Sequence, residues 1–354
     1  MAFFFSRDTK VFMSWSYDGS AAKTALYEIP VLDGFSFSQG TNTSEVTLSE
    51  AANSTGGSKR GRAMFTDSFA PAEWSFSTYM RPTVSGTGSA TTATDGVTNG
   101  QHGGNADKFA IEGPLWAAMS ANTYDRATGA SSADKSDYEP NVFNFANSNQ
   151  VTLGVFDLFF VLGASKDSEG NTYTTGTDGV TVYKLANCSV GSASIDFDIE
   201  GLAQIAWSGN GQSIEEVASL ETRATDSGNS ITGTTTLGIV NEGISSTSNY
   251  IRQKLTDLAI TFDHSASTGT LGALAVDGSN DVTYNVTLTG GNITIENNLT
   301  YLTPETLGSV NLPLGHVMGT RSISGNFTCY LDDRANGSLA LFENLQESRG
   351  VITN

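Results

Sequence analysis

The strongest constraint on the fold is a period of two in the hydrophobic pattern. In the segment Glu73–Met80, EWSFSTYM, apolar side chains such as Trp74 and Phe76 alternate with polar ones. Successive side chains of a β-strand point to opposite faces of a sheet, so this period predicts a strand with one buried and one exposed face. Similar alternation returns in Ile195–Glu200 and in Gly325–Asp333, nearer the other end of the chain.

Composition favours an all-β fold with minor α content. Only 16% of the 354 residues are charged, and 38 glycines accompany abundant Ser, Thr and Asn. This usage is typical of short strands joined by many turns. The length exceeds that of a usual single domain and allows two hydrophobic cores.

Two helices and one central strand stand out from this β pattern. The segment Gly113–Tyr124 has apolar residues at helical spacing and carries Pro114 where a first turn would begin. The segment Ser338–Arg349 has the same spacing, with Ser338 as its N-cap. The segment Val151–Gly163 is apolar nearly throughout, which predicts a strand buried on both faces.

The order of elements in the first half of the chain is repeated in the second. Each half runs through a strand, a glycine-marked turn, an alternating strand, a long hairpin loop, another alternating strand and an amphipathic helix. In the first half this order starts with a hairpin predicted for Ala25–Ser38. An internal duplication explains the order, and a shared preference for β-hairpins is the alternative. The predicted domains are residues 1–215, with an insertion at 82–112, and residues 216–354.

The chain is strongly acidic. Eighteen basic residues against 37 acidic ones give a formal net charge of −19. A surface that grips nucleic acid needs clustered Lys and Arg to release counterions from the phosphates. The sequence therefore disfavours a tight nucleic-acid binder, although an acidic protein can handle DNA by repelling it.

No residue pattern indicates catalysis. The Gly-x-Ser-x-Gly, phosphate-loop and His-Glu-x-x-His patterns are absent from the sequence. The histidines His102, His264 and His316 each stand alone in polar segments, and Cys188 and Cys329 lack the spacing of a zinc site. We therefore expect no enzymatic activity, no cofactor and no metal site.

One predicted strand carries a row of carboxylates. Asp196, Asp198 and Glu200 alternate with apolar residues, so all three lie on one strand face. A metal site or a glycosidase pair is one interpretation of such a row. Carboxylates that repel one another along a strand are more typical of a solvated surface.

Two pairs of segments resemble the tail tube proteins of long-tailed bacteriophages. In the first half they are EIPVLDGFSFSQGTNTSEVTLSE and APAEWSFSTYMRP; in the second they are GGNITIENNLTYLTPETLG and GTRSISGNFTCYLDD with its trailing helix. The resemblance lies in the order of strand, extended hairpin loop, aromatic strand and flanking helix. It covers about half of the chain, in both halves.

The resemblance implies two tandem β-barrel or β-sandwich units, each with a flanking helix, whose sheets join between subunits into a β-lined ring. Stacked rings would form the conduit for phage DNA. The common subunit of this family is a single such domain in hexameric rings, whereas this chain is about twice that length. The alternatives are a trimer of two-domain chains, which forms a pseudo-hexameric ring, and a hexamer of a decorated single domain.

The resemblance further implies a virion protein assembled in the host cytoplasm. Its partners would be other copies of itself, a sheath or tape measure protein, and initiator and terminator proteins. Phage DNA would pass through the lumen without specific binding. No segment approaches the roughly 18 apolar residues that span a bilayer, so no membrane partner is expected.

Two groups of residues are candidates for function in such a tube. Carboxylates in a lumen would repel the DNA phosphates, and long hairpin loops would reach the next ring. The candidate lumen-facing acids are Asp196, Asp198, Glu200 and Glu296. The candidate inter-ring residues are Lys59, Arg60 and Arg62 in the loop 49–72, and Leu307, Leu312 and His316 in the loop 303–320.

A carbohydrate-binding or adhesin-like β-sandwich of a virion or cell surface is the alternative function. It would share the low charge and the abundance of Ser, Thr, Gly and Asn, and Trp15 or Tyr124 would stack on sugars. It would not need the repeated long loops. A β-type glycoside hydrolase is the third interpretation and requires two carboxylates that face each other in a cleft.

Overall fold

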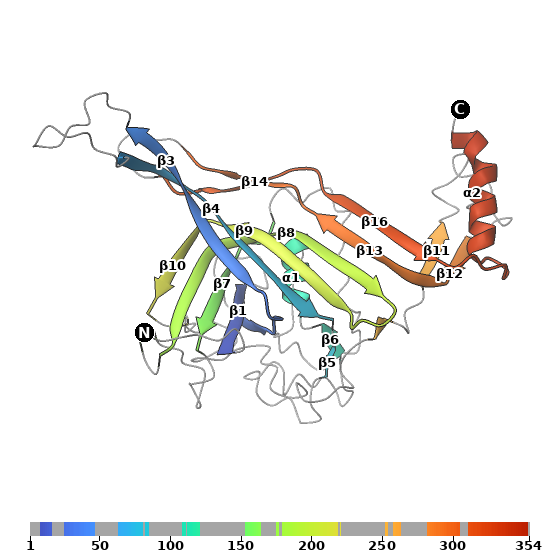
Figure 1. Ribbon diagram of the computed structural model, residues 1–354, viewed down its shortest axis with the longest axis horizontal. Helices are drawn as coiled ribbons and strands as arrows, with labels where there is room; N and C mark the ends of the chain where they lie inside the picture. The colour runs from blue at the N-terminus through green and yellow to red at the C-terminus, as the bar shows by residue number, and fades with distance from the viewer. Residues whose placement is uncertain are drawn as a thin grey trace, which may run out of the picture. The chain divides into compact units, whose positions relative to one another are not determined.

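Strands dominate the part of the chain that the structure describes (Figure 1). The all-β class with minor α content is therefore confirmed. The computed structural model describes residues 8–15, 25–46, 63–80, 82–84, 108–110, 112–120, 153–163, 175–176, 179–218, 220, 252–253, 258–262, 282–304 and 311–352.

The largest sheet has ten strands, with the order β2-β1-β7-β8-β9-β4-β3. Off this path, β10 pairs with β8, and β13 pairs with both β8 and β16. The described path is an open sheet that ends in β2 and β3, not a closed barrel. The ten strands are β1 (Thr9–Trp15), β2 (Ala25–Ile29), β3 (Ser36–Val46), β4 (Ala63–Tyr79), β7 (Phe156–Leu162), β8 (Thr181–Asp198), β9 (Gln204–Gly211), β10 (Ser213–Val217), β13 (Leu288–Glu296) and β16 (Ser322–Cys329).

Three smaller sheets and two helices complete the described elements. Each small sheet is an antiparallel pair of strands. The pairs are β5 (Pro82–Val84) with β6 (Lys108–Ala110), β11 (Leu258–Phe262) with β12 (Val282–Val286), and β14 (Leu299–Leu302) with β15 (Gly315–Met318). The helices are α1 (Gly113–Ser120) and α2 (Ser338–Ile352).

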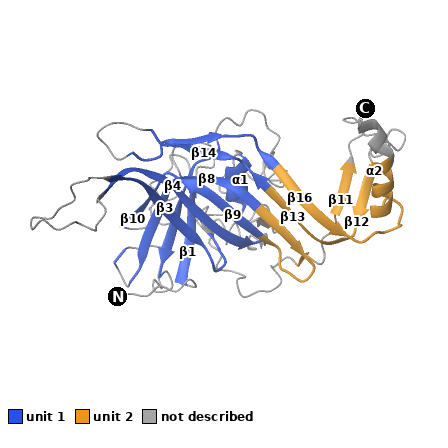
Figure 2. Ribbon diagram, turned by 45° about the horizontal axis from the view of Figure 1, so that its top comes forward, with its two compact units in different colours: residues 1–193, 205–249, 295–322 blue, residues 194–204, 250–294, 323–354 orange. Residues whose placement is uncertain are grey.

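The chain separates into two compact units, each built from three stretches of sequence (Figure 2). Unit 1 comprises residues 1–193, 205–249 and 295–322; unit 2 comprises residues 194–204, 250–294 and 323–354. The expected domains, 1–215 and 216–354, and the duplication that they imply stay predictions.

The alternating strand predicted around Trp74 is confirmed as part of β4. Trp74, Phe76 and Thr78 are at most 3% exposed, whereas Glu73 lies on the exposed face. Thr78 is tolerated in the core because its hydroxyl accepts a hydrogen bond from the indole N–H of Trp207, at 3.0 Å. A buried polar group with its partner in place avoids the cost of desolvation.

The central strand and the first helix are also confirmed. β7 is buried from Phe156 to Val161, between β1 and β8, so both of its faces lie in the core. α1 begins at Gly113 with Pro114 in its first turn, where a missing N–H costs no hydrogen bond. The predicted extension to Tyr124 falls outside the described residues.

The hairpin predicted for residues 25–38 is wrong, although its turn forms. Asp33 and Gly34 make a turn in which Gly34 has φ +100°, a conformation that favours glycine. The strands on either side do not pair with each other: β2 pairs with β1, and β3 pairs with β4. Each strand pairs instead with the strand on its other side in the sequence, so the turn links two strands that do not pair with each other.

In unit 2, α2 packs on the small sheet of β11 and β12. Buried Val282 and Tyr284 of β12 contact Ala340 and Leu341 of the helix. The side-chain amide of Asn344 donates a hydrogen bond to the Tyr284 hydroxyl at 2.6 Å. The predicted helix is confirmed. Two residues of its predicted apolar stripe, Phe342 and Leu345, remain 58% and 42% exposed.

Candidate channel and assembly surfaces

One face of the unit 1 sheet is lined by small polar side chains. The hydroxyls of Ser36 on β3 and Ser75 on β4 lie 2.8 Å apart, and those of Ser192 on β8 and Ser208 on β9 lie 2.7 Å apart. Each pair forms a cross-strand hydrogen bond, which satisfies hydroxyls on neighbouring strands. We call this surface the serine face: Ser36, Ser38, Ser75, Ser192, Ser208 and Asn210.

The serine face borders a hollow of about 480 Å³ that holds two carboxylates. They belong to Glu73 of β4 and Glu296 of β13, and neither forms an ion pair with another described residue. No Lys or Arg is among the residues that line the hollow. The surface is therefore polar and acidic, without cationic groups in the part of the chain that the structure describes.

Glu296 was predicted as a lumen-facing acid from its sequence, whereas Glu73 was not. The signal for Glu73 was present: it precedes Trp74 on the polar side of the alternating strand, beside Ser75. The sequence alone did not indicate that β4 and the end of β13 border one hollow. The structure shows that both carboxylates line the same hollow in unit 1.

The predicted row of three acids belongs to unit 2 and is less regular than a strand face. Asp196 and Asp198 are exposed near the end of β8. Glu200 lies in the bend that follows, and its backbone N–H donates to the Asp198 carboxylate at 3.3 Å. The chain turns after Asp198, so the period of two ends there. Whether these acids line a lumen stays a prediction.

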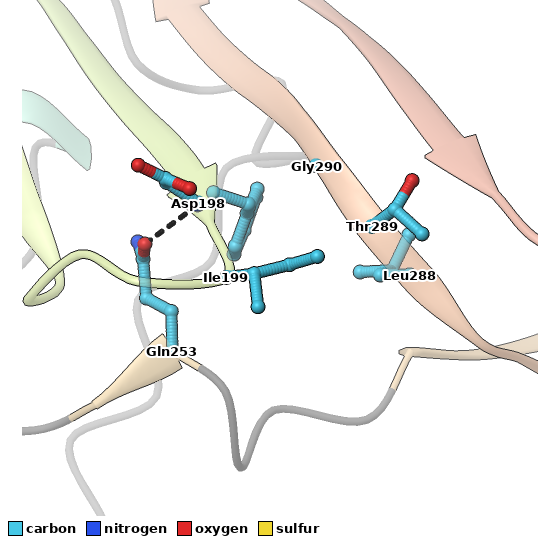
Figure 3. Close-up of a pocket in the computed structure, with 7 residues that line it drawn as sticks. Asp198, Ile199, Gln253, Leu288, Thr289 and Gly290 are labelled. Atoms are coloured by element: carbon cyan, nitrogen blue, oxygen red, sulfur yellow. Dashed lines mark hydrogen bonds between the residues drawn. The ribbon is translucent and has the colours of Figure 1, made fainter.

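A small hollow of about 150 Å³ lies beside Asp198 (Figure 3). The side chain of Gln253 fixes this strand end: its oxygen accepts the Asp198 N–H at 2.7 Å, and its Nε2 donates to the Asp196 carbonyl. Phe197, Ile199 and Leu288 supply apolar walls. No cluster of three metal-ligating side chains is found among the described residues.

The two segments predicted as inter-ring loops meet in unit 1, where residues 63–72 belong to β4 and residues 315–318 form β15. The backbone N–H of Phe69 on β4 donates to the carbonyl of Asn311 at 2.9 Å, and Ser68 forms a parallel bridge with Asn311. The described end of the β3–β4 hairpin and residues 302–304 and 311–317 thus form one structure, which we call the apolar arm (Figure 1). Its exposed apolar residues are Met64, Phe65, Leu302, Leu312, Leu314 and Val317.

The predicted inter-ring residues are only partly described. Leu312 is 42% exposed on the apolar arm, and His316 lies half-buried in β15. Lys59, Arg60, Arg62 and Leu307 fall outside the described residues, as do the side chains of Trp15 and Tyr124. The sequence did not indicate Phe65 and Leu314, which are 65% and 71% exposed.

The base of the arm is clamped to the end of α1. The side-chain amide of buried Asn297, just before β14, donates to the carbonyls of Met119 and Val190 at 3.1 and 2.9 Å. Arg321, just after β15, donates to the Asn297 side-chain oxygen at 2.8 Å and to the Met119 carbonyl at 3.0 Å. Both ends of the β14–β15 hairpin are therefore fixed, and the arm extends from a rigid base.

In unit 2, β16 presents a long exposed edge. Every residue from Ser322 to Thr328 is exposed, and among the described strands β16 pairs with β13 alone. Ile323 and Phe327 are 61% and 40% exposed, followed by Tyr330 at 67%. Unpaired strand edges with apolar side chains are surfaces on which another chain can add a strand.

Whole-chain comparison confirms the resemblance to bacteriophage tail tube proteins. The chain is 28% identical over 348 residues to the tail tube protein pb6 of Escherichia phage T5. The aligned region covers 98% of this chain and 61% of the relative, so the chain spans about three fifths of that relative's length. No protein-family model matches the chain.

One solved structure shares a weak likeness. It is the sheath/tube terminator of an extracellular contractile injection system in its extended state, with 9% identity and a TM-score of 0.29. The likeness covers 59% of this chain and 94% of the other, and at this TM-score it carries no argument. Separately, none of the helices in the described ranges has the length and apolar character needed to cross a membrane.

Proposed function

We propose that this chain is a tail tube subunit, a virion protein of a long-tailed bacteriophage that polymerises into stacked rings around a channel for DNA. The observation that carries the proposal is the alignment of nearly the whole chain with a tail tube protein. The exposed edge of β16 and the apolar arm support it, because such surfaces mark sites of association. The proposed role requires assembly and no catalysis.

In the proposed ring, the edge of β16 pairs with a strand of a neighbouring copy, and the apolar arm contacts the next ring. Joining sheets across subunits satisfies edge N–H and C=O groups that water would otherwise solvate. The sheath or tape measure protein and the initiator and terminator proteins are the further proposed partners. The ring contains three copies if the duplication is real and six if the chain acts as one decorated domain.

The serine face is the proposed channel wall, with Glu73 and Glu296 as its acids. In each bonded pair one hydroxyl donates its hydrogen to the other, so fewer donors are left for a passing phosphate. Its carboxylates repel the DNA backbone and deny it the counterion release that a basic groove provides. A polar wall of this kind lets DNA slide without holding it. Asp196, Asp198 and Glu200 form the second proposed acidic group.

Rotationally averaged electron microscopy of the purified protein tests the tube. Stacked rings with a central hole are expected, with three-fold symmetry and six similar lobes for the duplicated chain. Six identical chains per ring would support the tube and contradict the duplication. A protein that stays monomeric under all assembly conditions, including addition of the other tail proteins, would contradict the proposal.

Reversing the charge of the proposed channel wall is expected to make tubes retain DNA. In the variant Glu73→Lys/Glu296→Lys, each subunit places two cations where two carboxylates stood, and a ring multiplies the change by its number of copies. Tubes should still assemble, and they should bind double-stranded DNA with an affinity that falls steeply with salt. Gel retardation with assembled tubes between about 50 and 200 mM salt measures this.

The matched control is Glu215→Lys/Glu216→Lys, because these two acids are exposed on β10 and line no described hollow. It makes the same change in net charge away from the wall. Asp196→Lys/Asp198→Lys tests the second acidic group in the same assay. If the Glu73/Glu296 variant and the β10 control retain DNA equally, the serine face does not line the channel.

A further inference from the structure

Two side chains of the β14–β15 hairpin fasten it to the sheet of unit 1. The Tyr301 hydroxyl lies 2.9 Å from the backbone carbonyl of Asn210 on β9 and 3.3 Å from that of Asn187 on β8. On β15, His316 Nδ1 lies 3.1 Å from the hydroxyl of Ser189 on β8, and its ring contacts that of Tyr301 at 5.8 Å between centroids. The β14–β15 hairpin, which supplies part of the apolar arm, is thus held by the clamp at its base and by these two side chains.

The second nitrogen of His316 has no partner. Its Nε2 is buried, and no described group lies within hydrogen-bond reach of it. The Nδ1 is satisfied by Ser189, a residue with no exposed surface. A neutral imidazole is compatible with this site because only one of its nitrogens then carries a proton. A protonated imidazole would bury an N–H and a positive charge with no acceptor, which is costly.

The surroundings of His316 contain little charge to offset such a proton. The segments β9, β14 and β15 contain no Asp, Glu, Lys or Arg, and neither does β8 between Leu185 and Ile195. The titratable groups on these elements are Tyr301 and Cys188, and burial raises the pKa of Tyr301 well above its usual range. The Glu296 carboxylate on β13 contacts the Ser322 hydroxyl. No described carboxylate contacts the histidine.

We propose that Tyr301 and His316 form a latch that holds the β14–β15 part of the apolar arm in its stacking position, and that protonation of His316 releases this part. Release on acidification would then unstack the rings, a consequence that depends on the tube function proposed above. The latch itself is a property of the single subunit. It assigns a role to the half-buried histidine that differs from direct contact with the next ring.

The direction of the pH effect follows from burial, which lowers the pKa of His316 below its usual value of 6.5 in the latched state. Well above pH 6.5 the ring is neutral in both the latched and released states, so the latch has its full strength. Below pH 6.5 the released state takes up the proton more readily. Each further pH unit favours release about tenfold, until the latched state is protonated as well.

Hydrogen exchange on the full-length, unassembled subunit tests the latch directly. Amide protection of residues 299–302 and 315–318, corrected for intrinsic exchange, should fall roughly fivefold between about pH 6.5 and 5.5, while protection of β7 stays unchanged. His316→Phe keeps an aromatic ring without a titrating nitrogen and should abolish this response. Tyr301→Phe removes the anchoring hydroxyl and should lower protection at both pH values.

A second measurement, an NMR titration of His316, leaves Tyr301 and His316 unmutated. In the variant His102→Gln/His264→Gln, the one remaining imidazole signal in an NMR titration belongs to His316 and should have a midpoint below 6.5. A midpoint at or above 6.5, or an acid response that persists in His316→Phe, would overturn the latch. Both measurements use single subunits. A failure to form tubes would therefore refute the proposed function, and the latch could still be tested.

Discussion

Replacing Gly209 by alanine is expected to destabilise unit 1 by about 3 kcal/mol or more. Gly209 lies in β9, where a Cβ atom would overlap the backbone carbonyl of Ser189 and come within 2.5 Å of the Trp74 ring. Neither neighbour can move easily. The carbonyl belongs to the adjacent strand β8, and the ring packs between Phe76 and Phe156, with centroids at 5.1 and 5.9 Å.

Urea unfolding followed by tryptophan fluorescence measures this loss, and Gly315→Ala is the matched control. Gly315 lies in β15 with no atom within 4 Å of its would-be Cβ, so the same substitution there should change stability by less than about 1 kcal/mol. The free energy of unfolding of a domain is about 5–15 kcal/mol, so a loss of about 3 kcal/mol should clearly lower the urea concentration at the unfolding midpoint. Equal midpoints for the two variants would show that β8 and β9 separate at little cost.

The period of two predicted the strands of the core, and it did so for a physical reason. Alternation in β4 and continuous apolarity in β7 both report which faces are buried, and burial is a local property of each segment. The starts of α1 and α2 were predicted from Pro114 and Ser338, although the Ser338 hydroxyl bonds to Tyr330 and Asp332 before the helix and not to a helix N–H. Features that depend only on residues nearby in the sequence could therefore be predicted.

The pairing partners of the strands could not be predicted from the sequence. β2 and β3 flank a well-formed turn, yet each pairs with the strand on its other side, β1 or β4, because the energy of pairing depends on cross-strand side-chain contacts that a turn does not specify. The same limit applied to the surfaces. The sequence did not indicate that Glu73 and Glu296 line the same hollow. Nor did it indicate that the two predicted inter-ring segments are bonded to each other through Phe69 and Asn311.

Phe65→Asp/Leu314→Asp is expected to abolish ring stacking while leaving the subunit folded. Both side chains are exposed on the apolar arm, at 65% and 71%, so neither supports the core. Burying two such side chains in a ring-to-ring contact would contribute about 3–6 kcal/mol per subunit. Three or six copies per ring multiply that loss, and a buried aspartate adds a desolvation cost. The concentration needed for tubes should rise beyond any practical value.

Sedimentation and electron microscopy measure the outcome as the fraction of protein in tubes. Thr41→Asp/Thr43→Asp is the matched control, because these exposed threonines lie on β3 of the same hairpin, and the change adds the same charge without removing apolar surface. If both variants fail to stack, added charge on the arm is sufficient and apolar contact is not established. If both form tubes of normal length, the arm does not carry the ring-to-ring contact. Loss of tubes in the Phe65/Leu314 variant alone identifies the apolar side chains as the stacking surface, since charge and location are then held constant.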